Sequence, residues 1–456
     1  MTRQRSAKLL AFAATRNQPR SCVRELRFAK AAFLVSVFLA AAIASPAKTS
    51  FTTLYSFCSQ TNCADGSTPY AGLVQATGGS FLGTTYTGGN NDGGTVFRIN
   101  AKGGMATLYS FCSQTGCADG STPYAGLLQA RNGNFYGTTE AGGTAGAGSV
   151  FKITRSGRLT VLHSFDGSDG FTPYAGLVQA ADGNFYGTTG GSASGANISG
   201  TVFKITAKGK LTTLYYFCSQ TNCSDGANPW GVLVQAIDGD FYGTTAAGGT
   251  HVCKTRGEEK IGCGTVFKIT AKGKLTTLYN FCSQGGSNCT DGVTPLAGLV
   301  EASDGSFYGT TSGGGAGASG TVFKITGQGE LTTLHSFNGT DGATPYAGLL
   351  QASDGNFYGT ARFGGTNNSG VIFKVTAAGK LTTLYNFCSQ TNCSDGSFPQ
   401  AALIEATTGR FYGTTSAGGD ADSGTVFSLS VDLGPSVEAP STSKGGKAGH
   451  GPKKII

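Results

Sequence analysis

Paired cysteines are the residues in this 456-residue chain whose type and spacing most clearly indicate chemistry. Ten of the thirteen form close pairs in a repeated loop, and another pair lies inside the longest insertion. Two copies of the loop have lost both cysteines together, as a local disulfide predicts. We expect six bridges: Cys58–Cys63, Cys112–Cys117, Cys218–Cys223, Cys253–Cys263, Cys282–Cys289 and Cys388–Cys393. Such bridges persist in oxidising compartments outside the cytoplasm.

A metal site is the alternative interpretation of the same cysteines. C-x4-C is a poor spacing for zinc, and no repeated cysteine loop has a nearby histidine to complete four ligands. The sequence therefore predicts disulfides, and it points to no metal and no cofactor.

Signals for catalysis are sparse. His163 and His335 stand where other units have tyrosine, which makes them variants of the repeat, and His450 lies near the C-terminus. The chain has no G-x-S-x-G or H-E-x-x-H motif, and its glycine clusters lack the setting of phosphate-binding loops. We therefore assign no catalytic residue.

An aspartate followed by glycine occurs in all seven copies of the loop between units. These residues are Asp65, Asp119, Asp169, Asp225, Asp291, Asp341 and Asp395. A ring of carboxylates could bind calcium, but one carboxylate per unit does not supply six to eight converging oxygens. We favour turns in which the aspartate bonds to its own backbone.

These loops belong to a unit that occurs seven times. The pentapeptide FYGTT, or a close variant, begins at Phe81, Phe135, Phe185, Phe241, Phe307, Phe357 and Phe411. A period near 50 residues indicates a propeller or a solenoid. Each unit has four strand-like runs; in the sixth these are Tyr346–Ala352, Asn356–Thr360, Val371–Thr376 and Leu381–Phe387.

Four strands in each of seven units predict an all-β, seven-bladed propeller over residues 51–431. An open solenoid is the alternative. The ends of the repeat favour a closed ring, because Phe51–Phe57 matches the strand that the last unit lacks after Gly424–Val431. Pairing of these segments would remove an exposed edge. The cysteine loops and the long glycine-rich loops would then share one face, which we expect to be the working face.

The N-terminal region differs from the repeat. Basic residues precede Ala31–Ala44, an apolar run too short for a comfortable membrane span. We interpret residues 1–44 as a secretory signal peptide, cleaved after Ala44 or Ala47, and residues 45–50 as a short linker. An uncleaved anchor is the alternative. Residues 432–456, rich in Gly, Ser, Pro and Lys, are predicted to be disordered.

Most of the positive charge lies outside the repeat. The chain has a net charge of +8, of which residues 1–44 hold +7 and residues 432–456 hold +2, so the ring is near −1. Nucleic-acid binding needs a basic face on the folded domain. We therefore expect no nucleic-acid partner, and no stable membrane span once the signal is removed.

Departures from the repeat are the candidates for an asymmetric binding site. Trp230 replaces a tyrosine that recurs after the loop proline, and Arg362 and Phe363 stand in a glycine-rich loop. The longest insertion, Thr250–Gly264, contains further candidates: His251, Lys254, Arg256, Glu258, Glu259 and Lys260. Neutral drift in surface loops is the alternative explanation for all of them.

The unit resembles a known family. The segment from Pro345 to Phe387, PYAGLLQASDGNFYGTARFGGTNNSGVIFKVTAAGKLTTLYNF, is similar to the GloVer tandem repeat of bacterial choice-of-anchor proteins. The resemblance covers all seven units and implies an exported or surface-displayed protein of unassigned activity. No apolar anchor segment follows Gly434, where members of this family often carry one.

The sequence thus predicts a secreted or cell-envelope protein that acts as a binding or structural module for an extracellular ligand, such as a glycan or a protein. The alternative is an enzyme of the propeller lyase or lactonase type acting at the central channel. A converging pair of Glu301 and Glu405 beside a cation would favour that alternative. The other five units have glutamine at the position of these two glutamates, and amides there favour binding over catalysis.

Overall fold

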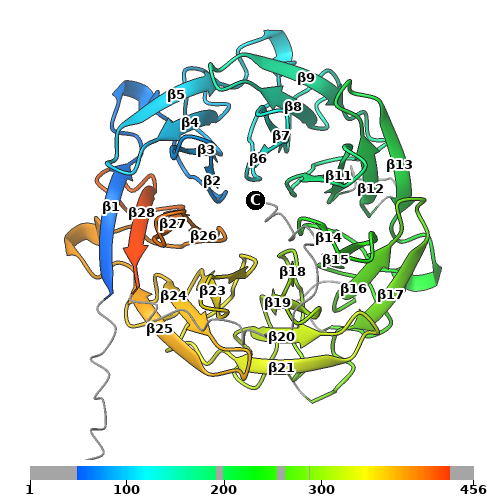
Figure 1. The fold of residues 1–456 in the computed structure, drawn as a ribbon. Helices are drawn as coiled ribbons and strands as arrows, with labels where there is room; N and C mark the ends of the chain where they lie inside the picture. Colours follow the sequence, from blue (N-terminus) through cyan, green and yellow to red (C-terminus); the bar gives the residue numbers. More distant parts are fainter. Residues whose placement is uncertain (1–48, 192–198, 254–261, 287, 432–456) are drawn as a thin grey trace, which may run out of the picture. The chain divides into compact units, whose positions relative to one another are not determined.

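The repeat folds into seven antiparallel sheets of four strands, which form a ring as a seven-bladed β-propeller (Figure 1). The computed structural model describes residues 49–191, 199–253, 262–286 and 288–431. We call the strands of each blade A to D, from the centre of the ring outward. The predicted fold class is therefore confirmed, whereas the predicted signal peptide and C-terminal tail lie outside the described residues.

Strand A is two residues long in every blade. The A strands are β2 (Val74–Gln75), β6 (Leu128–Gln129), β10 (Val178–Gln179), β14 (Val234–Gln235), β18 (Val300–Glu301), β22 (Leu350–Gln351) and β26 (Ile404–Glu405). The prediction of a long inner strand, Tyr346–Ala352 in the sixth unit, is wrong. The chain before β22 leaves the ladder because it converges on the ring axis, and the carbonyl of Ala347 there accepts a 3.0 Å hydrogen bond from Thr310 Oγ1 of the preceding blade.

Strand B contains the FYGTT motif and is fully buried. The B strands are β3 (Phe81–Thr85), β7 (Phe135–Thr139), β11 (Phe185–Thr189), β15 (Phe241–Thr245), β19 (Phe307–Thr311), β23 (Phe357–Ala361) and β27 (Phe411–Thr415). The central glycine is required by close packing. A Cβ atom on Gly137 would lie 2.7 Å from the ring of Phe151 in the adjacent strand.

Strands C and D complete each blade. The C strands are β4 (Thr95–Ile99), β8 (Ser149–Ile153), β12 (Thr201–Ile205), β16 (Thr265–Ile269), β20 (Thr321–Ile325), β24 (Val371–Val375) and β28 (Thr425–Ser430). The D strands are β5 (Met105–Ser110), β9 (Leu159–Ser164), β13 (Leu211–Tyr216), β17 (Leu275–Asn280), β21 (Leu331–Ser336), β25 (Leu381–Asn386) and, for the last blade, β1 (Ser50–Ser56).

The last blade closes the ring. Strand β1 pairs antiparallel with β28, from Ser50 opposite Ser430 to Ser56 opposite Thr425. The exposed edge that the last unit would otherwise leave is therefore covered, as the sequence predicts.

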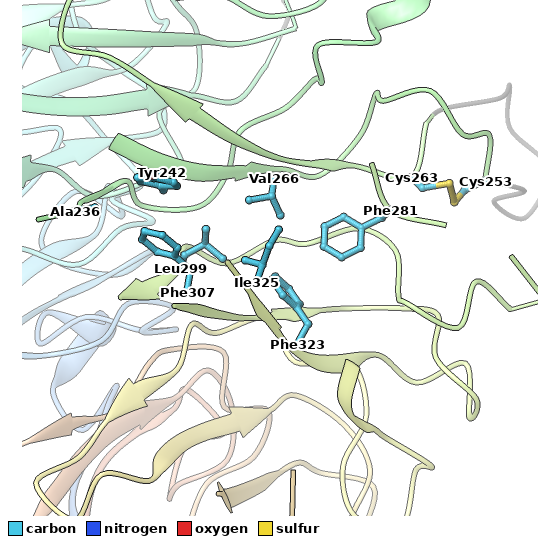
Figure 2. Packing of buried hydrophobic residues seen from close by; sticks show 10 residues of the cluster. All are labelled: Ala236, Tyr242, Cys253, Cys263, Val266, Phe281, Leu299, Phe307, Phe323 and Ile325. Atoms are coloured by element: carbon cyan, nitrogen blue, oxygen red, sulfur yellow. A yellow bond between two sulfur atoms is a disulfide. The ribbon is translucent and has the colours of Figure 1, made fainter. Parts of the chain in front are cut away.

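The hydrophobic core lies between blades. Figure 2 shows one of seven clusters, in which Tyr242 and Val266 of the fourth blade pack with Phe307 and Phe323 of the fifth. The rings of Tyr242 and Phe307 stack with centroids 4.1 Å apart. Each blade thus buries its apolar side chains against its neighbours.

The loops divide between two faces of the ring. The D–A loop between blades and the B–C loop within a blade meet on one face, as the bridge between Ser67 and Thr87 shows. We call it the disulfide face, and the opposite face, with the A–B and C–D turns, the turn face. Four D–A loops contain a 3-10 helix: η1 (Thr61–Cys63), η2 (Thr115–Cys117), η3 (Thr221–Cys223) and η4 (Thr391–Cys393).

Candidate functional site

Disulfides are present at all the predicted positions. Five lie in D–A loops, and Cys253–Cys263 joins the ends of the insertion. In the two loops without cysteines, a histidine takes part in holding the loop. His163 and His335 contact Asp169 and Asp341 through Nε2, at 2.6 and 2.8 Å.

The recurring aspartates organise the D–A loops. The carboxylate of Asp119 accepts hydrogen bonds from the hydroxyl of Tyr109 at 2.7 Å and from the backbone N–H groups of Ser113 and Gln114 at 2.9 and 3.1 Å. Burial would raise the pKa of this carboxyl group, but the hydrogen bonds outweigh burial and lower the pKa below its usual value. The carboxylate is therefore used within its own unit, as a structural role predicts. The Asx-turn expected from the sequence is not what forms, because the backbone donors lie five and six residues before the aspartate.

The last residue of strand A links neighbouring blades at the turn face. Gln179 Oε1 accepts a 2.9 Å hydrogen bond from the backbone N–H of Arg131. Glu301 and Glu405 make the same contact with the backbone N–H groups of Ile237 and Ser353, at 3.3 and 2.8 Å. Amide and carboxylate serve equally here because the contact needs only an acceptor oxygen. These two glutamates therefore have the same structural role as the glutamines.

On the disulfide face, the central channel opens through a ring of side chains that follow the loop prolines. A cavity of about 310 Å3 lies behind this opening. The side chains at the opening, one from each blade, are Tyr70, Tyr124, Tyr174, Trp230, Leu296, Tyr346 and Gln400. Tyr86, Glu140 and Arg362 contact these side chains, and Phe363 contacts Arg362. We call all of these residues together the channel mouth.

Aromatic rings cover one side of the channel mouth. Centroids are 5.1 Å apart for Tyr70 and Tyr124, 5.4 Å for Tyr124 and Tyr174, and 5.2 Å for Tyr174 and Trp230. Tyr86 extends this arc, 5.1 Å from Tyr70. Four consecutive blades thus present a continuous aromatic surface. Trp230 is 36% exposed and is held by a 3.1 Å hydrogen bond from its Nε1 to the carbonyl of Gly190.

Among the described residues, one carboxylate contacts this arc. Glu140 Oε1 accepts a 3.1 Å hydrogen bond from the hydroxyl of Tyr174. Burial, with the negative charge of Glu140 adding to it, raises the pKa of Tyr86 and of Tyr174 to about 12. Both phenols are therefore neutral at physiological pH and can donate hydrogen bonds.

The guanidinium group of Arg362 lies on the other side of the mouth. Arg362 sits over the rings of Tyr346 and Phe363, with its Cζ 5.1 and 4.8 Å from their centroids. Within the described part of the chain, its Nε has no hydrogen-bond partner and no carboxylate forms an ion pair with it. The positive charge of Arg362 and the negative charge of Glu140 both act on the phenol of Tyr124, whose pKa burial raises to about 12.

The structure brings together only some of the residues that the sequence singled out. Trp230, Arg362 and Phe363 lie at the channel mouth. His251 belongs to the insertion, which begins at the outer side of its blade, where the backbone N–H of Thr250 donates a 3.0 Å hydrogen bond to Asn280 at the end of β17. The charged residues Lys254, Arg256, Glu258, Glu259 and Lys260 lie outside the described residues.

Sequence reasoning missed Tyr86 and Glu140. Both directly follow the FYGTT-type motif, as does Arg362. The corresponding residues in the other four units are Gly190, Ala246, Ser312 and Ser416. The sequence did offer a signal for these residues: they are large or charged at a position where the other units have a small side chain.

The protein is thus a seven-bladed β-propeller whose channel mouth carries aromatic and charged side chains. The family model of the Gloeobacter/Verrucomicrobia repeat matches residues 43–256, 193–349 and 253–453, and the chain belongs to this repeat family. The resemblance of the motifs is thereby confirmed. No curated protein matches the chain.

Comparison with solved structures finds similar chains at low sequence identity. The extracellular domain of a protein described as a hybrid two component system from B. thetaiotaomicron is 11% identical, with a TM-score of 0.52 over 83% of this chain and 39% of that one. This chain thus spans about two-fifths of that relative. A protein described as a 6-phosphogluconolactonase from Bacteroides uniformis is 18% identical, with a TM-score of 0.47 over 75% of this chain and 88% of that one. The first likeness concerns the fold alone.

No helix in the part of the chain that the structure describes is long and apolar enough to cross a membrane.

Proposed function

We propose that this protein is an exported binding module that takes a glycan at the channel mouth. The observation that carries the proposal is the arc of aromatic rings next to Glu140 and Arg362. A cavity of about 310 Å3 is at the lower end of the range for small-molecule sites. It would admit one end of a ligand, while the rest stays outside on the aromatic arc.

The composition of the mouth fits a sugar better than a purely apolar ligand. A sugar ring has an apolar C–H face, which stacks on aromatic rings, and a rim of hydroxyl groups. Aromatic side chains supply a large apolar surface with a polar edge, and a few polar groups fix the orientation of the ligand. Glu140 would accept from sugar hydroxyls, and Arg362 would donate to a hydroxyl or to an acidic group.

The alternative, an enzyme of the lyase or lactonase type, finds less support. Such chemistry needs acidic or basic groups that converge on one substrate atom. The glutamates that could have converged, Glu301 and Glu405, bind backbone N–H groups at the turn face instead.

Export is part of the proposal. The chain carries six disulfides, which persist outside the cytoplasm. Residues 1–44 would be the signal peptide, with the propeller released after Ala44 or Ala47 and residues 432–456 as a tail. N-terminal sequencing of the secreted protein tests this, and a start at Met1 would contradict it.

A glycan array followed by titration calorimetry tests the binding function. The variants Trp230→Ala and Arg362→Gln should each weaken binding of a glycan hit by tenfold or more. Tyr216 provides the control, because it is 43% exposed on the outermost strand of the third blade. Tyr216→Ala should leave affinity unchanged. Absence of any glycan hit, or equal affinity in all three variants, would overturn the proposal.

A further inference from the structure

Two disulfides lie against each other beside the insertion. Cys253–Cys263 comes from the B–C loop of the fourth blade, and Cys282–Cys289 from the D–A loop that follows this blade. The four Sγ atoms all lie within 4.8 Å of one another. In the described ranges this is the one group of three or more His, Cys, Asp or Glu side chains with the spacing of a metal site.

Both loops depart from the repeat at this place. The bridge Cys282–Cys289 spans seven residues, whereas the other four D–A bridges span five. Its loop also lacks the 3-10 helix that the other four contain, as judged from its described residues. The B–C loop of the fourth blade carries a cysteine pair of its own, Cys253 and Cys263. The two altered loops are neighbours and together place four sulfur atoms in one cluster. We therefore interpret both alterations as parts of one site.

The position of the sulfur atoms is set by the blade core. Cys263 is 1% exposed and Cys253 is 9% exposed. Both belong to the interblade cluster that contains Phe281 and Val266 (Figure 2). Cys282 and Cys289 pack against this cluster. Interblade packing, and not the disulfides alone, therefore holds these four cysteines in place.

We propose that Cys253, Cys263, Cys282 and Cys289 form a redox-dependent metal site that binds one zinc ion when the two disulfides are reduced. In a tetrahedral thiolate site with zinc–sulfur bonds of about 2.3 Å, the sulfur atoms are about 3.8 Å apart. The four sulfur atoms already lie within 4.8 Å of one another. Reduction would let the two sulfurs of each bridge move apart by side-chain rotation to this spacing.

The chemistry balances with a dithiol reductant. Each dithiol transfers two electrons and two protons to one disulfide, which gives two cysteine thiols, and the dithiol itself becomes a disulfide. Two equivalents therefore yield four thiols. Zinc then replaces the four thiol protons, because the thiolate is the ligand. Oxidation would release the ion and restore both bridges.

Sequence spacing alone conceals this site. Paired zinc ligands usually lie closer in sequence than the separations of 10 and 7 found in these two pairs. Four ligands are assembled only because the D–A loop and the B–C loop meet on the disulfide face.

The test uses a chain in which the other paired cysteines are replaced by serine. The replaced residues are Cys58, Cys63, Cys112, Cys117, Cys218, Cys223, Cys388 and Cys393. The D–A loops that contain Asp169 and Asp341 fold without cysteines. A D–A loop of this fold therefore does not require a disulfide. After reduction this chain should retain one zinc per molecule through dialysis, and cobalt should give the absorption of tetrahedral thiolate coordination. The oxidised chain should retain none.

A matched control contains equally many thiols without the cluster. It keeps Cys112, Cys117, Cys388 and Cys393 and replaces the other paired cysteines by serine. This control should bind at least a hundredfold more weakly, as should Cys263→Ser in the test chain. Equal zinc in test and control, half an ion per chain, or no zinc would each overturn the proposal.

A second measurement avoids the loss of eight cysteines. The unaltered protein is reduced without denaturant, exposed to an alkylating reagent with or without zinc, and analysed by peptide mass spectrometry. Zinc should slow alkylation of the four cluster cysteines tenfold or more, and leave Cys112 and Cys117 unprotected. Equal alkylation of both groups would contradict the proposal.

Discussion

The ring of Phe51 stacks on that of Tyr385, with centroids 3.9 Å apart and planes within 6° of parallel. Phe51 belongs to the first described strand and Tyr385 to the outer strand of the sixth blade. The contact therefore joins the start of the repeat to a blade near its end, next to the pairing of β1 with β28.

Removal of the closing strand should open the ring. Deletion of Phe51–Phe57 exposes the edge of β28 and removes both Phe51 and the fully buried Phe57. We expect the melting temperature to fall by several degrees or more, with a loss of solubility. Phe51→Ala, which keeps the backbone pairing, should have a smaller effect in the same direction. Melting curves that match the intact protein would show that closure contributes nothing to stability.

The repeated disulfides should stabilise the ring through the unfolded state. Replacing Cys112 and Cys117 together by serine should cost about 2 kcal/mol or less, because the loop that the bridge closes is short. Peptide mapping of the secreted protein should recover all six bridges, and free thiols at most positions would contradict both the pairing and export.

Acid should weaken the D–A loops. The pKa of Asp119 is lowered in the folded protein, so this group stabilises the fold above the unfolded-state pKa near 4, and its contribution is lost as the pH falls through the folded-state pKa. Asp119→Asn should cost about 2 kcal/mol at pH 7, since it removes an ionised acceptor of several hydrogen bonds. The difference from the wild type should shrink toward pH 2.

Melting temperature against pH measures this effect. Asp420→Asn is the control, because Asp420 is exposed on the disulfide face. A constant difference between Asp119→Asn and the wild type across the whole pH range would show that the ionised carboxylate is not what stabilises the loop.

A side chain placed in the channel should weaken binding of a ligand that enters it. Gly348 lines the cavity, and the fourth blade has Val232 at the corresponding position, so the fold already accepts valine there. A Cβ atom on Gly348 would lie 3.3 Å from the carbonyl oxygen of Gly298, which requires only a small adjustment.

The variant Gly348→Val should therefore fold normally and lower affinity for a glycan hit about tenfold. The reverse change, Val232→Gly, should not lower it. Calorimetric titration of both variants compares them directly. Full affinity in Gly348→Val would place the ligand outside the cavity, on the aromatic arc alone.

Much of the architecture could be predicted because the same pattern occurs in seven units. A strand that is ambiguous in one unit is recognised from the others. Seven copies of FYGTT or a close variant identified strand B, and the match of Phe51–Phe57 to the missing strand identified the closure. The length of strand A could not be predicted. Its apolar residues suit a strand, but convergence on the ring axis replaces ladder bonds by contacts such as that of Thr310 with Ala347.

The channel mouth was only partly predictable for a related reason. Trp230, Arg362 and Phe363 stood out because they break the pattern. Glu140 breaks it too, but its proximity to Tyr174 and to the arc depends on the ring, which brings single positions from all blades to one opening. Four separate cysteines become neighbours in the same way.

The insertion Thr250–Gly264 remains the second candidate for partner recognition. It is stapled by Cys253–Cys263, and pre-ordering of a loop lowers the entropic cost of binding. Its first residue, Thr250, lies beside Asn280 at the end of the outer strand of the fourth blade. We expect a long glycan or a protein partner to contact both this insertion and the channel mouth, and a short glycan to contact the mouth alone.

Replacement of Thr250–Gly264 by the corresponding part of the next blade, Ala316–Gly320, separates these cases. The neighbouring loop closes the same B–C connection, so the blade should fold and its melting temperature should change by only a few degrees. If the insertion takes part in recognition, affinity for a long glycan or a protein partner should fall tenfold or more, while a short glycan that fills the mouth should bind as before. Trp230→Ala should weaken both kinds of ligand, because the mouth is common to them. A loop-swapped protein that binds every ligand with full affinity would exclude the insertion from recognition and leave the channel mouth as the binding site.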